Sequence, residues 1–208
     1  MNNKLLIEVG AYDSSNSLKY YNNGYTVYTF EPNKICYNYI KNKTSHLLNY
    51  NVINSAVCLY NGETEFNICK EGGASSLLNF KSDSELNNIW KNREDIHYSG
   101  NSYKVETIRL DTFIENYNLQ NKIIDYIHID AQGVDLDVLK SLGKYIKNVK
   151  EGGVEIVIDI SKTIYINQTN NYIGLKLFLE ENNFRIYRVE QNDETMCEYN
   201  VYFKNNIY

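Results

Sequence analysis

Short apolar runs alternate with polar stretches through the first half of the chain, and this alternation is the strongest constraint on its fold. Lys4–Val9, Tyr25–Phe30 and Asn51–Leu59 are compact runs of apolar, aromatic and β-branched residues, a composition that favours strands. Ser14–Asn23 and Asn33–Lys43, which separate them, are polar enough for exposed helices. This order of strands and helices predicts a parallel, doubly wound sheet.

The rest of the chain carries further strand and helix signals, without an internal repeat or an interdomain linker. Asn61-Gly62 predicts a hairpin between Val57–Tyr60 and Glu65–Cys69. Further strands are expected at Tyr103–Leu110, Ile123–Ile129 and Val154–Ile160, a closing strand pair at Phe184–Val189 with Tyr199–Phe203, and helices at Lys81–Glu94, Val134–Leu142 and Asn171–Asn182. We therefore expect a single α/β domain over residues 1–208.

Charge and composition argue against several classes of protein. Lys and Arg number 21 against 26 Asp and Glu, and this net charge of −5 disfavours a basic nucleic-acid surface. Met1–Gly10 lacks the apolar stretch of a signal peptide, and no run approaches the about 20 apolar residues that span a bilayer. The four cysteines are scattered, so the chain lacks the close pair expected of a zinc site or a redox dithiol: Cys36, Cys58, Cys69 and Cys197. We expect a cytoplasmic protein without a metal or a membrane partner.

The turn after the first apolar run is the first candidate site. Strands of a doubly wound sheet present their carboxyl ends to nucleotide-like ligands, and Gly10 allows the backbone to approach such a ligand closely. Glu31 follows the second strand about 20 residues later, where a carboxylate can accept hydrogen bonds from both ribose hydroxyls. A tight turn without a ligand and a surface carboxylate are the alternative interpretations.

Missing phosphate-binding features narrow the choice of ligand. The turn after Gly10 lacks the second and third glycines of a dinucleotide site, and the chain has no Walker Gly-Lys-Ser/Thr sequence. A nucleoside with an amino-acid tail therefore fits better than a dinucleotide or ATP. Asp13 and neighbouring backbone amides could meet the charged groups of that tail, and Asp13 or Ser14 could cap the following helix.

A second candidate site follows the buried run Ile123–Ile129. Asp130 could orient or deprotonate an acceptor hydroxyl, and His128 is the other candidate base. Strand alternation predicts that these two side chains share one face. The alternatives are that Asp130 only caps the next helix and that His128 is a satisfied core residue.

Several stretches of the chain carry a family resemblance. They are IEVGAYDSSNS at Ile7–Ser17, TFEPN at Thr29–Asn33, NSAVCLYNGE at Asn54–Glu63, GASSL at Gly73–Leu77, ETIRLDTFI at Glu106–Ile114, IDYIHIDAQGVDLDVLKSLG at Ile124–Gly143 and, more loosely, NVKEGGVEI at Asn148–Ile156 and YINQ at Tyr165–Gln168. Together they resemble the FkbM family of S-adenosylmethionine-dependent methyltransferases. The resemblance implies an α/β, Rossmann-like class I methyltransferase fold: a mostly parallel seven-stranded sheet with an antiparallel closing strand and helices on both faces. It also implies a variable hairpin or loop insertion around 61–103 that covers the acceptor pocket.

The same resemblance implies S-adenosylmethionine as the cofactor and suggests roles for individual residues. Gly10 and its loop would hold the methionine portion, Glu31 the ribose and Asn54-Ser55-Ala56 the adenine, with Asp130 and Gln132 close to the methyl group. The implied cofactor set also contains Glu8, Ala11, Tyr12, Asp13 and Pro32, while Ser75, Ser76 and Glu155 match positions on the acceptor side, with Glu155 a third candidate catalytic residue. Three residues depart from frequent family choices: Glu8 replaces Asp, Ser14 replaces Gly and Gln132 replaces Glu.

The resulting hypothesis is methyl transfer to a hydroxyl of a sugar, glycan or other small molecule. Alignment of acceptor, methyl group and sulfur can supply most of the catalysis, because the sulfonium leaving group is already excellent. A catalytically degenerate binding or scaffold domain is the alternative. A nucleic-acid methyltransferase is disfavoured by the acidic composition, and the sequence leaves the oligomeric state open.

Overall fold

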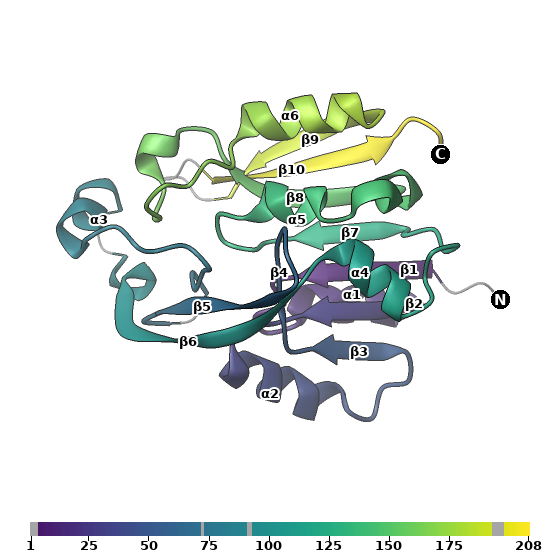
Figure 1. Ribbon diagram of the computed structural model, residues 1–208, viewed down its shortest axis with the longest axis horizontal. Helices are drawn as coiled ribbons and strands as arrows, with labels where there is room; N and C mark the ends of the chain where they lie inside the picture. Colours follow the sequence, from purple (N-terminus) through teal and green to yellow (C-terminus); the bar gives the residue numbers. More distant parts are fainter. Residues whose placement is uncertain (1–3, 72, 91–92, 193–197) are drawn as a thin grey trace.

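A computed structural model of the chain describes residues 4–71, 73–90, 93–192 and 198–208. Within these residues the main sheet contains seven strands in the order β3-β2-β1-β7-β8-β10-β9 (Figure 1). The strands are β1 (Lys4–Val9), β2 (Tyr25–Phe30), β3 (Tyr50–Ile53), β7 (Tyr126–Ile129), β8 (Glu151–Val157), β9 (Phe184–Gln191) and β10 (Glu198–Asn205). Neighbouring strands pair in parallel among β3, β2, β1, β7 and β8, whereas β10 runs antiparallel to both of its neighbours, β8 and β9.

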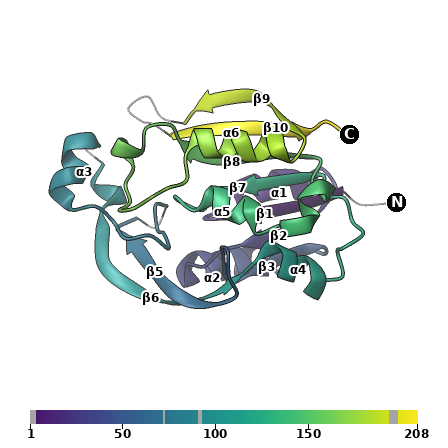
Figure 2. The same ribbon diagram turned by 45° about the horizontal axis from the view of Figure 1, so that its top comes forward.

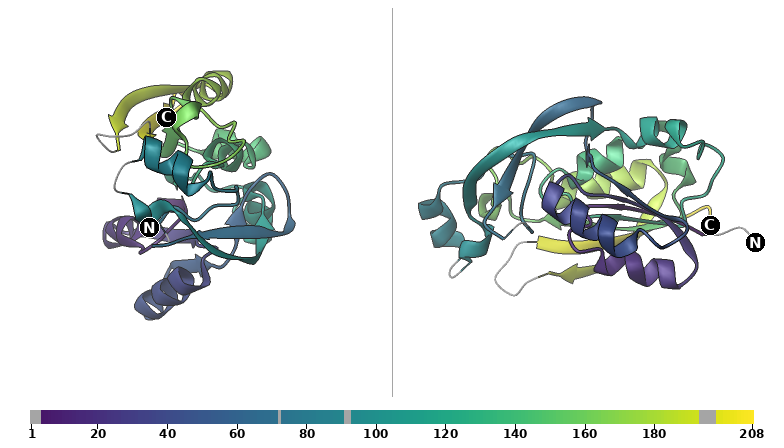
Figure 3. Two further views of the ribbon diagram at one scale, coloured as in Figure 1. Left: turned by 90° about the vertical axis from the view of Figure 1, so that its left-hand side faces the viewer. Right: turned by 90° about the horizontal axis from the view of Figure 1, so that it is seen from below.

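Helices cover both faces of this sheet because its central strands are apolar on both sides. Leu5, Ile7 and Val9 of β1 pack into the core under α4 (Leu110–Asn116), α5 (Asp135–Lys140) and α6 (Tyr172–Glu181). Leu6 points the other way, into a cluster with side chains of α1 (Ser15–Asn22) and α2 (Lys34–Thr44). Figures 2 and 3 show α1 on the opposite side of the sheet from α5 and α6. Burial on both faces is typical of parallel strands.

A smaller sheet is built from the segment that follows β3. It has the order β4-β6-β5, with β4 (Ala56–Val57), β5 (Gly62–Cys69) and β6 (Tyr98–Ile108), and α3 (Asp83–Ile89) lies beside it (Figure 1). The predicted hairpin is therefore wrong. Asn61-Gly62 does turn the chain, but Thr107 of β6 lies between Ala56 and Gly62 and is register partner to both. The long strand β6 occupies the pairing edge that a local hairpin would have used.

Other predicted strands also differ from the structure: β7 begins at Tyr126 and not at Ile123, and β8 spans Glu151–Val157 and not Val154–Ile160. Asn51–Leu59 is not one strand, since it divides between β3 and β4 in different sheets. The break lies at Asn54, whose side-chain amide donates to the backbone oxygens of Glu31 (2.8 Å) and Pro32 (3.2 Å) and so turns the chain. The strand expected at Tyr103–Leu110 begins earlier, at Tyr98, and ends at Ile108, and Leu110 instead opens the unpredicted helix α4.

The predicted fold class, a mostly parallel sheet with helices on both faces, is confirmed. The sheet is mostly parallel with an antiparallel closing strand, and the expected pair near the C-terminus is β9 with β10. Among the described residues, no helix is long and apolar enough to cross a membrane.

Candidate functional site

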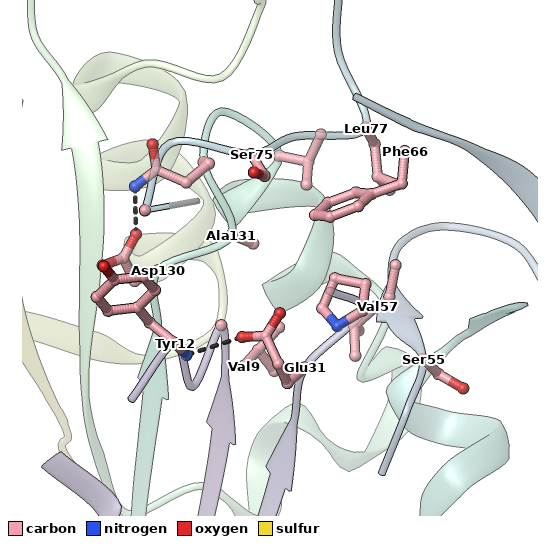
Figure 4. A pocket seen from close by; sticks show the side chains of 16 residues that line it. Val9, Tyr12, Glu31, Ser55, Val57, Phe66, Ser75, Leu77, Asp130 and Ala131 are labelled. Atoms are coloured by element: carbon pink, nitrogen blue, oxygen red, sulfur yellow. Dashed lines mark hydrogen bonds between the residues drawn. The ribbon is translucent and has the colours of Figure 1, made fainter. Parts of the chain in front are cut away.

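A cleft lies at the carboxyl ends of β1, β2 and β7, with an empty volume of about 560 Å³ that is partly open to solvent (Figure 4). Nine residues predicted from the sequence line it: Gly10, Tyr12, Glu31, Pro32, Ser55, Ala56, Ser75, Asp130 and Gln132. Sequence reasoning did not identify the other seven, which are Val9, Val57, Phe66, Gly73, Leu77, Ala131 and Val134. This location is where doubly wound sheets bind nucleotide-like ligands.

Gly10 is required by the geometry of the cleft floor. Its φ is +82°, and a Cβ placed on it would lie 1.8 Å from the carbonyl oxygen of Asp130. The backbone N–H of Asp130 donates to the carbonyl of Val9 at 2.9 Å, so the ends of β1 and β7 are tightly joined here. The absence of a side chain at Gly10 therefore brings the first loop against Asp130, in addition to leaving room for a ligand.

Glu31 is a buried carboxylate held by backbone donors. Its two oxygens accept hydrogen bonds from the backbone N–H groups of Tyr12 and Asn33, each at 2.8 Å, and the residue is only 5% exposed. Burial raises the pKa of Glu31 to about 7, against the lowering effect of these two hydrogen bonds. Each oxygen keeps a further lone pair for a hydroxyl donor in the cleft.

Apolar side chains form the wall on the other side of Glu31. Phe66 of β5 and Leu77 lie opposite Tyr12 across the cleft, and Val57 of β4 lies beneath them (Figure 4). Pro32 extends the same wall. The cleft thus combines one carboxylate with a flat apolar surface, which suits a sugar attached to an aromatic base.

Glu8 and His128 are not among the described residues that line the cleft. They are register partners on β1 and β7, with His128 Nδ1 at 3.9 Å from Glu8 Oε1. Glu8 is 1% exposed and accepts hydrogen bonds from Asn16 of α1 and Thr29 of β2, and burial raises its pKa. The strand ends at Ile129, so alternation no longer governs Asp130, and the structure does not bring His128 and Asp130 together at the cleft.

Four other predicted residues support the cleft from behind its lining. Asn54 fixes the backbone after β2, as described above. Ser76 donates to the carbonyl of Gln132 at 2.6 Å, and Ala11 donates its backbone N–H to Phe30 at 3.2 Å. Asp13 accepts from the backbone N–H of Ser15 at 2.8 Å and so caps α1, while Ser14 makes no side-chain cap.

A second cavity adjoins the cleft, with an empty volume of about 690 Å³ that is also partly open to solvent. Gly73, Asp130 and Gln132 line both spaces and form the wall between them. The predicted acceptor-side residue Glu155 lies in this second cavity. Sequence reasoning missed the rest of its lining, to which Trp90, Arg93, Asp95, Asn192 and Glu198 contribute the larger or charged side chains.

The side-chain amide of Gln132 connects the two carboxylates at this wall. Its Nε2 donates to Asp130 at 2.7 Å and to Glu155 at 3.1 Å, and its Oε1 accepts from the hydroxyl of Tyr165 at 2.8 Å. Burial, together with the nearby charges of Asp130 and Glu198, holds the pKa of Glu155 well above its ordinary value. Glu155 is therefore protonated more readily than an exposed glutamate.

The loop that carries Gln132 is held from below by Asp135. Gln132 and Gly133 have φ values of +52° and +95°, a left-handed turn that needs support at Gln132. The buried carboxylate of Asp135 accepts from the backbone N–H groups of Ala131 (2.5 Å) and Gly133 (2.9 Å). These bonds fix the loop between the two cavities.

Comparison with known protein families shows to which family the chain belongs. The sequence model of the FkbM methyltransferase domain matches residues 8–186, well over half of the chain. The chain belongs to the FkbM methyltransferase domain family. S-adenosylmethionine is the cofactor of this family, so the protein is an S-adenosylmethionine-dependent methyltransferase. A comparison with curated proteins gave no significant match.

Solved methyltransferase structures share the fold of this FkbM domain. Magnesium protoporphyrin IX methyltransferase from Synechocystis PCC 6803, with bound SAM, is 8% identical over 98% of this chain and 71% of that chain, with a TM-score of 0.51. The ribosomal protein L11 methylase from Lactobacillus delbrueckii subsp. bulgaricus is also 8% identical, over 99% of this chain and 71% of that chain, with a TM-score of 0.50. At such identities the likeness concerns the fold alone, and it confirms the predicted class I methyltransferase architecture.

The structure also shows the backbone of Ser14, one of the residues at which the sequence resemblance implied a departure from the FkbM pattern. Ser14 stands where family members often have glycine, and it adopts a left-handed conformation with φ 65° and ψ 10°. A non-glycine residue in that conformation costs about 1 kcal/mol. The Ser14 hydroxyl donates to the carbonyl of Asp13 at 2.5 Å, a local contact that glycine lacks.

Proposed function

We propose that this FkbM domain transfers the methyl group of S-adenosylmethionine to a hydroxyl of a sugar, glycan or other small polar acceptor. The observation that supports it is the shared wall of Gly73, Asp130 and Gln132 between the two cavities. A donor in the cleft and an acceptor in the second cavity would meet at that wall. Methyl transfer needs such alignment more than it needs strong chemical activation.

The cleft residues fit the parts of S-adenosylmethionine. Glu31 retains lone pairs for the two ribose hydroxyls, and the apolar wall with Phe66 and Leu77 suits the adenine. The loop that begins at Gly10 would hold the methionine portion, since Gly10 brings this loop against Asp130. Tyr12 contributes its backbone N–H to Glu31 and its ring to the cleft.

Asp130 is our candidate for the group that handles the acceptor proton. When bound, S-adenosylmethionine would supply an electrophilic methyl carbon to the acceptor oxygen, and its sulfur would keep the electron pair of the broken bond. The Asp130 carboxylate orients the hydroxyl and receives its proton, and Gln132 holds that carboxylate in place through its 2.7 Å hydrogen bond. His128 is less suited to this role, because its side chain contacts Glu8 beneath the cleft.

Nucleic acid is not the acceptor that we propose. The net charge of −5 and the carboxylates of the second cavity oppose a phosphate backbone. Methylation of RNA in a competition with small acceptors would contradict this part of the proposal.

Titration calorimetry with S-adenosylmethionine, S-adenosylhomocysteine and NAD is the first test. We expect micromolar binding of the two sulfur compounds, no binding of NAD, and loss of binding in Glu31→Ala but not in Glu63→Ala, an exposed glutamate on β5. Absence of binding by folded protein would refute a methyltransferase role and favour the scaffold alternative.

Turnover with a set of sugar and small-molecule acceptors is the second test. Asp130→Ala should lower the rate of methyl transfer by about 100-fold or more and leave cofactor affinity within about threefold. Unchanged turnover in that variant would remove Asp130 from the mechanism. Cofactor binding without transfer to any acceptor would again favour a scaffold.

A further inference from the structure

Tyr12 connects two parts of the donor cleft. Its backbone N–H donates to Glu31, the carboxylate that we assign to the ribose, at 2.8 Å. At the far end of its side chain, a Cβ placed on Gly73 would lie 3.9 Å from Cε2 and 4.0 Å from Cζ of the Tyr12 ring. Gly73 belongs to the wall that the cleft shares with the second cavity. The side chain of Tyr12 therefore extends from the ribose site toward the wall at which we propose methyl transfer.

The ring of Tyr12 is accessible to a ligand. It lines the cleft on the side opposite Phe66 (Figure 4), and the residue is 49% exposed. Its hydroxyl contacts the Glu71 carbonyl at 3.5 Å, which is long for a hydrogen bond. Lys43, whose ammonium donates to a carbonyl of the same loop at 3.2 Å, lies over the ring of Tyr39 instead. The Tyr12 ring thus keeps free surface inside the cleft.

The backbone of Tyr12 and the charge state of its hydroxyl also bear on its role. Its φ is +48°, a left-handed conformation that is uncommon for an aromatic residue and that glycine adopts without strain. Strained residues of this kind cluster at ligand sites. Burial raises the pKa of the Tyr12 hydroxyl, so the side chain is a neutral phenol at physiological pH. Its attraction for a cation therefore comes from the face of the ring.

We propose that the ring of Tyr12 binds the sulfonium of S-adenosylmethionine through a cation–π contact and so distinguishes the donor from its neutral product, S-adenosylhomocysteine. The sulfur stands between the ribose and the reactive methyl group, which is the stretch of the cleft that Tyr12 spans. After transfer the sulfur is an uncharged thioether, and this attraction is lost. The contact thus favours exchange of product for fresh donor. This inference rests on the proposed placement of the cofactor, and it gives Tyr12 a specificity-determining role at that site.

Matched variants and ligands separate the charge of the sulfonium from its shape. Tyr12→Leu removes the aromatic ring but keeps an apolar side chain, whereas Tyr12→Phe keeps the ring and loses only the hydroxyl. Titration calorimetry of the full-length protein and both variants measures the affinity for S-adenosylmethionine, S-adenosylhomocysteine and the sulfoxide of S-adenosylhomocysteine, which is neutral but carries an oxygen in place of the methyl group. We expect Tyr12→Leu to weaken binding of S-adenosylmethionine about fivefold and of the two neutral ligands less than about twofold. Tyr12→Phe should keep the parent's preference for the donor.

Several outcomes would overturn the inference. Equal weakening of all three ligands in Tyr12→Leu would show that the ring only packs against the cofactor, and unchanged affinities would show that it makes no contact. Loss of the preference in Tyr12→Phe would assign it to the hydroxyl. Both variants place a non-glycine residue at the same backbone angle, so the strain of the loop does not distinguish them. Absence of binding of every ligand by folded parent protein would refute the cofactor placement itself, whereas binding that does not depend on the ring refutes only this inference.

Discussion

Replacement of Glu31 by Gln gives a pH-dependent change in stability that follows from the burial of this carboxyl group. Its pKa is about 7 in the folded protein and 4.5 ordinarily, so the unfolded chain loses this proton first as pH rises. Rising pH therefore favours unfolding between these two values, by about 3 kcal/mol in total. About 2.5 kcal/mol of that loss falls between pH 5 and pH 8, and below pH 4.5 it disappears.

The variant removes this pH dependence but also loses a hydrogen bond. Gln has one side-chain acceptor oxygen, so only one of the backbone N–H groups of Tyr12 and Asn33 keeps its partner. That loss costs about 1–3 kcal/mol at every pH. We expect Glu31→Gln to be less stable than the parent at pH 5, and to gain about 2.5 kcal/mol relative to it by pH 8.

Urea unfolding of both proteins at several pH values measures this difference. Trp90, the single tryptophan, is 3% exposed in the folded protein and serves as the fluorescence probe. Asp135 also has a pKa raised to about 7 by burial, but it is present in both proteins and cancels in the comparison. A stability difference that stays constant from pH 5 to pH 8 would refute the assignment of the raised pKa to Glu31.

Three further measurements test the same geometry. Affinity for S-adenosylmethionine, measured by calorimetry, should fall about tenfold for each pH unit below 7, because we expect the ribose hydroxyls to bind ionised Glu31. An affinity that does not change with pH would contradict this role of Glu31. Gly10→Ala should lower the unfolding free energy by at least about 3 kcal/mol in urea titrations, since its Cβ would overlap the Asp130 carbonyl; a change below 1 kcal/mol would contradict the close approach. Tyr165→Phe should cost about 1–2 kcal/mol and lower the methyl-transfer rate more than cofactor affinity, because the one hydroxyl that lies between Gln132 Oε1 (2.8 Å) and the Ala74 carbonyl (2.7 Å) is lost; an unaltered rate would show that this hydroxyl is not needed.

The local sequence pattern predicted the helices and strands at the start of the chain. Strands β1 and β2 have the predicted bounds, and the helices expected after them are α1 and α2. Their apolar runs and polar intervals are continuous in sequence, so periodicity reports them directly. The same local signals predicted Gly10 and Glu31 at the ends of these strands, and both line the cleft.

Pairing between distant segments could not be derived from the same signals. A turn at Asn61-Gly62 is a local property, but the strand beside it is β6, about 40 residues later, and its placement depends on packing of the whole smaller sheet. Helix α4 was missed for a related reason. It is short, with seven residues, and its buried Leu110, Phe113 and Ile114 also suit a strand until the core is assembled around them.

By itself, the sequence indicated the family, the first strands and helices, and nine of the sixteen residues that line the cleft, since each of these signals depends on neighbours along the chain. The tertiary structure alone decided which polar groups share a space. It placed His128 against Glu8, outside the described lining of the cleft, and it brought Arg93 and Glu198 to the cavity of Glu155. The physical reason is that strand ends and loops acquire their neighbours only when the sheets pack, and the charge of a cavity is the sum over all of those neighbours.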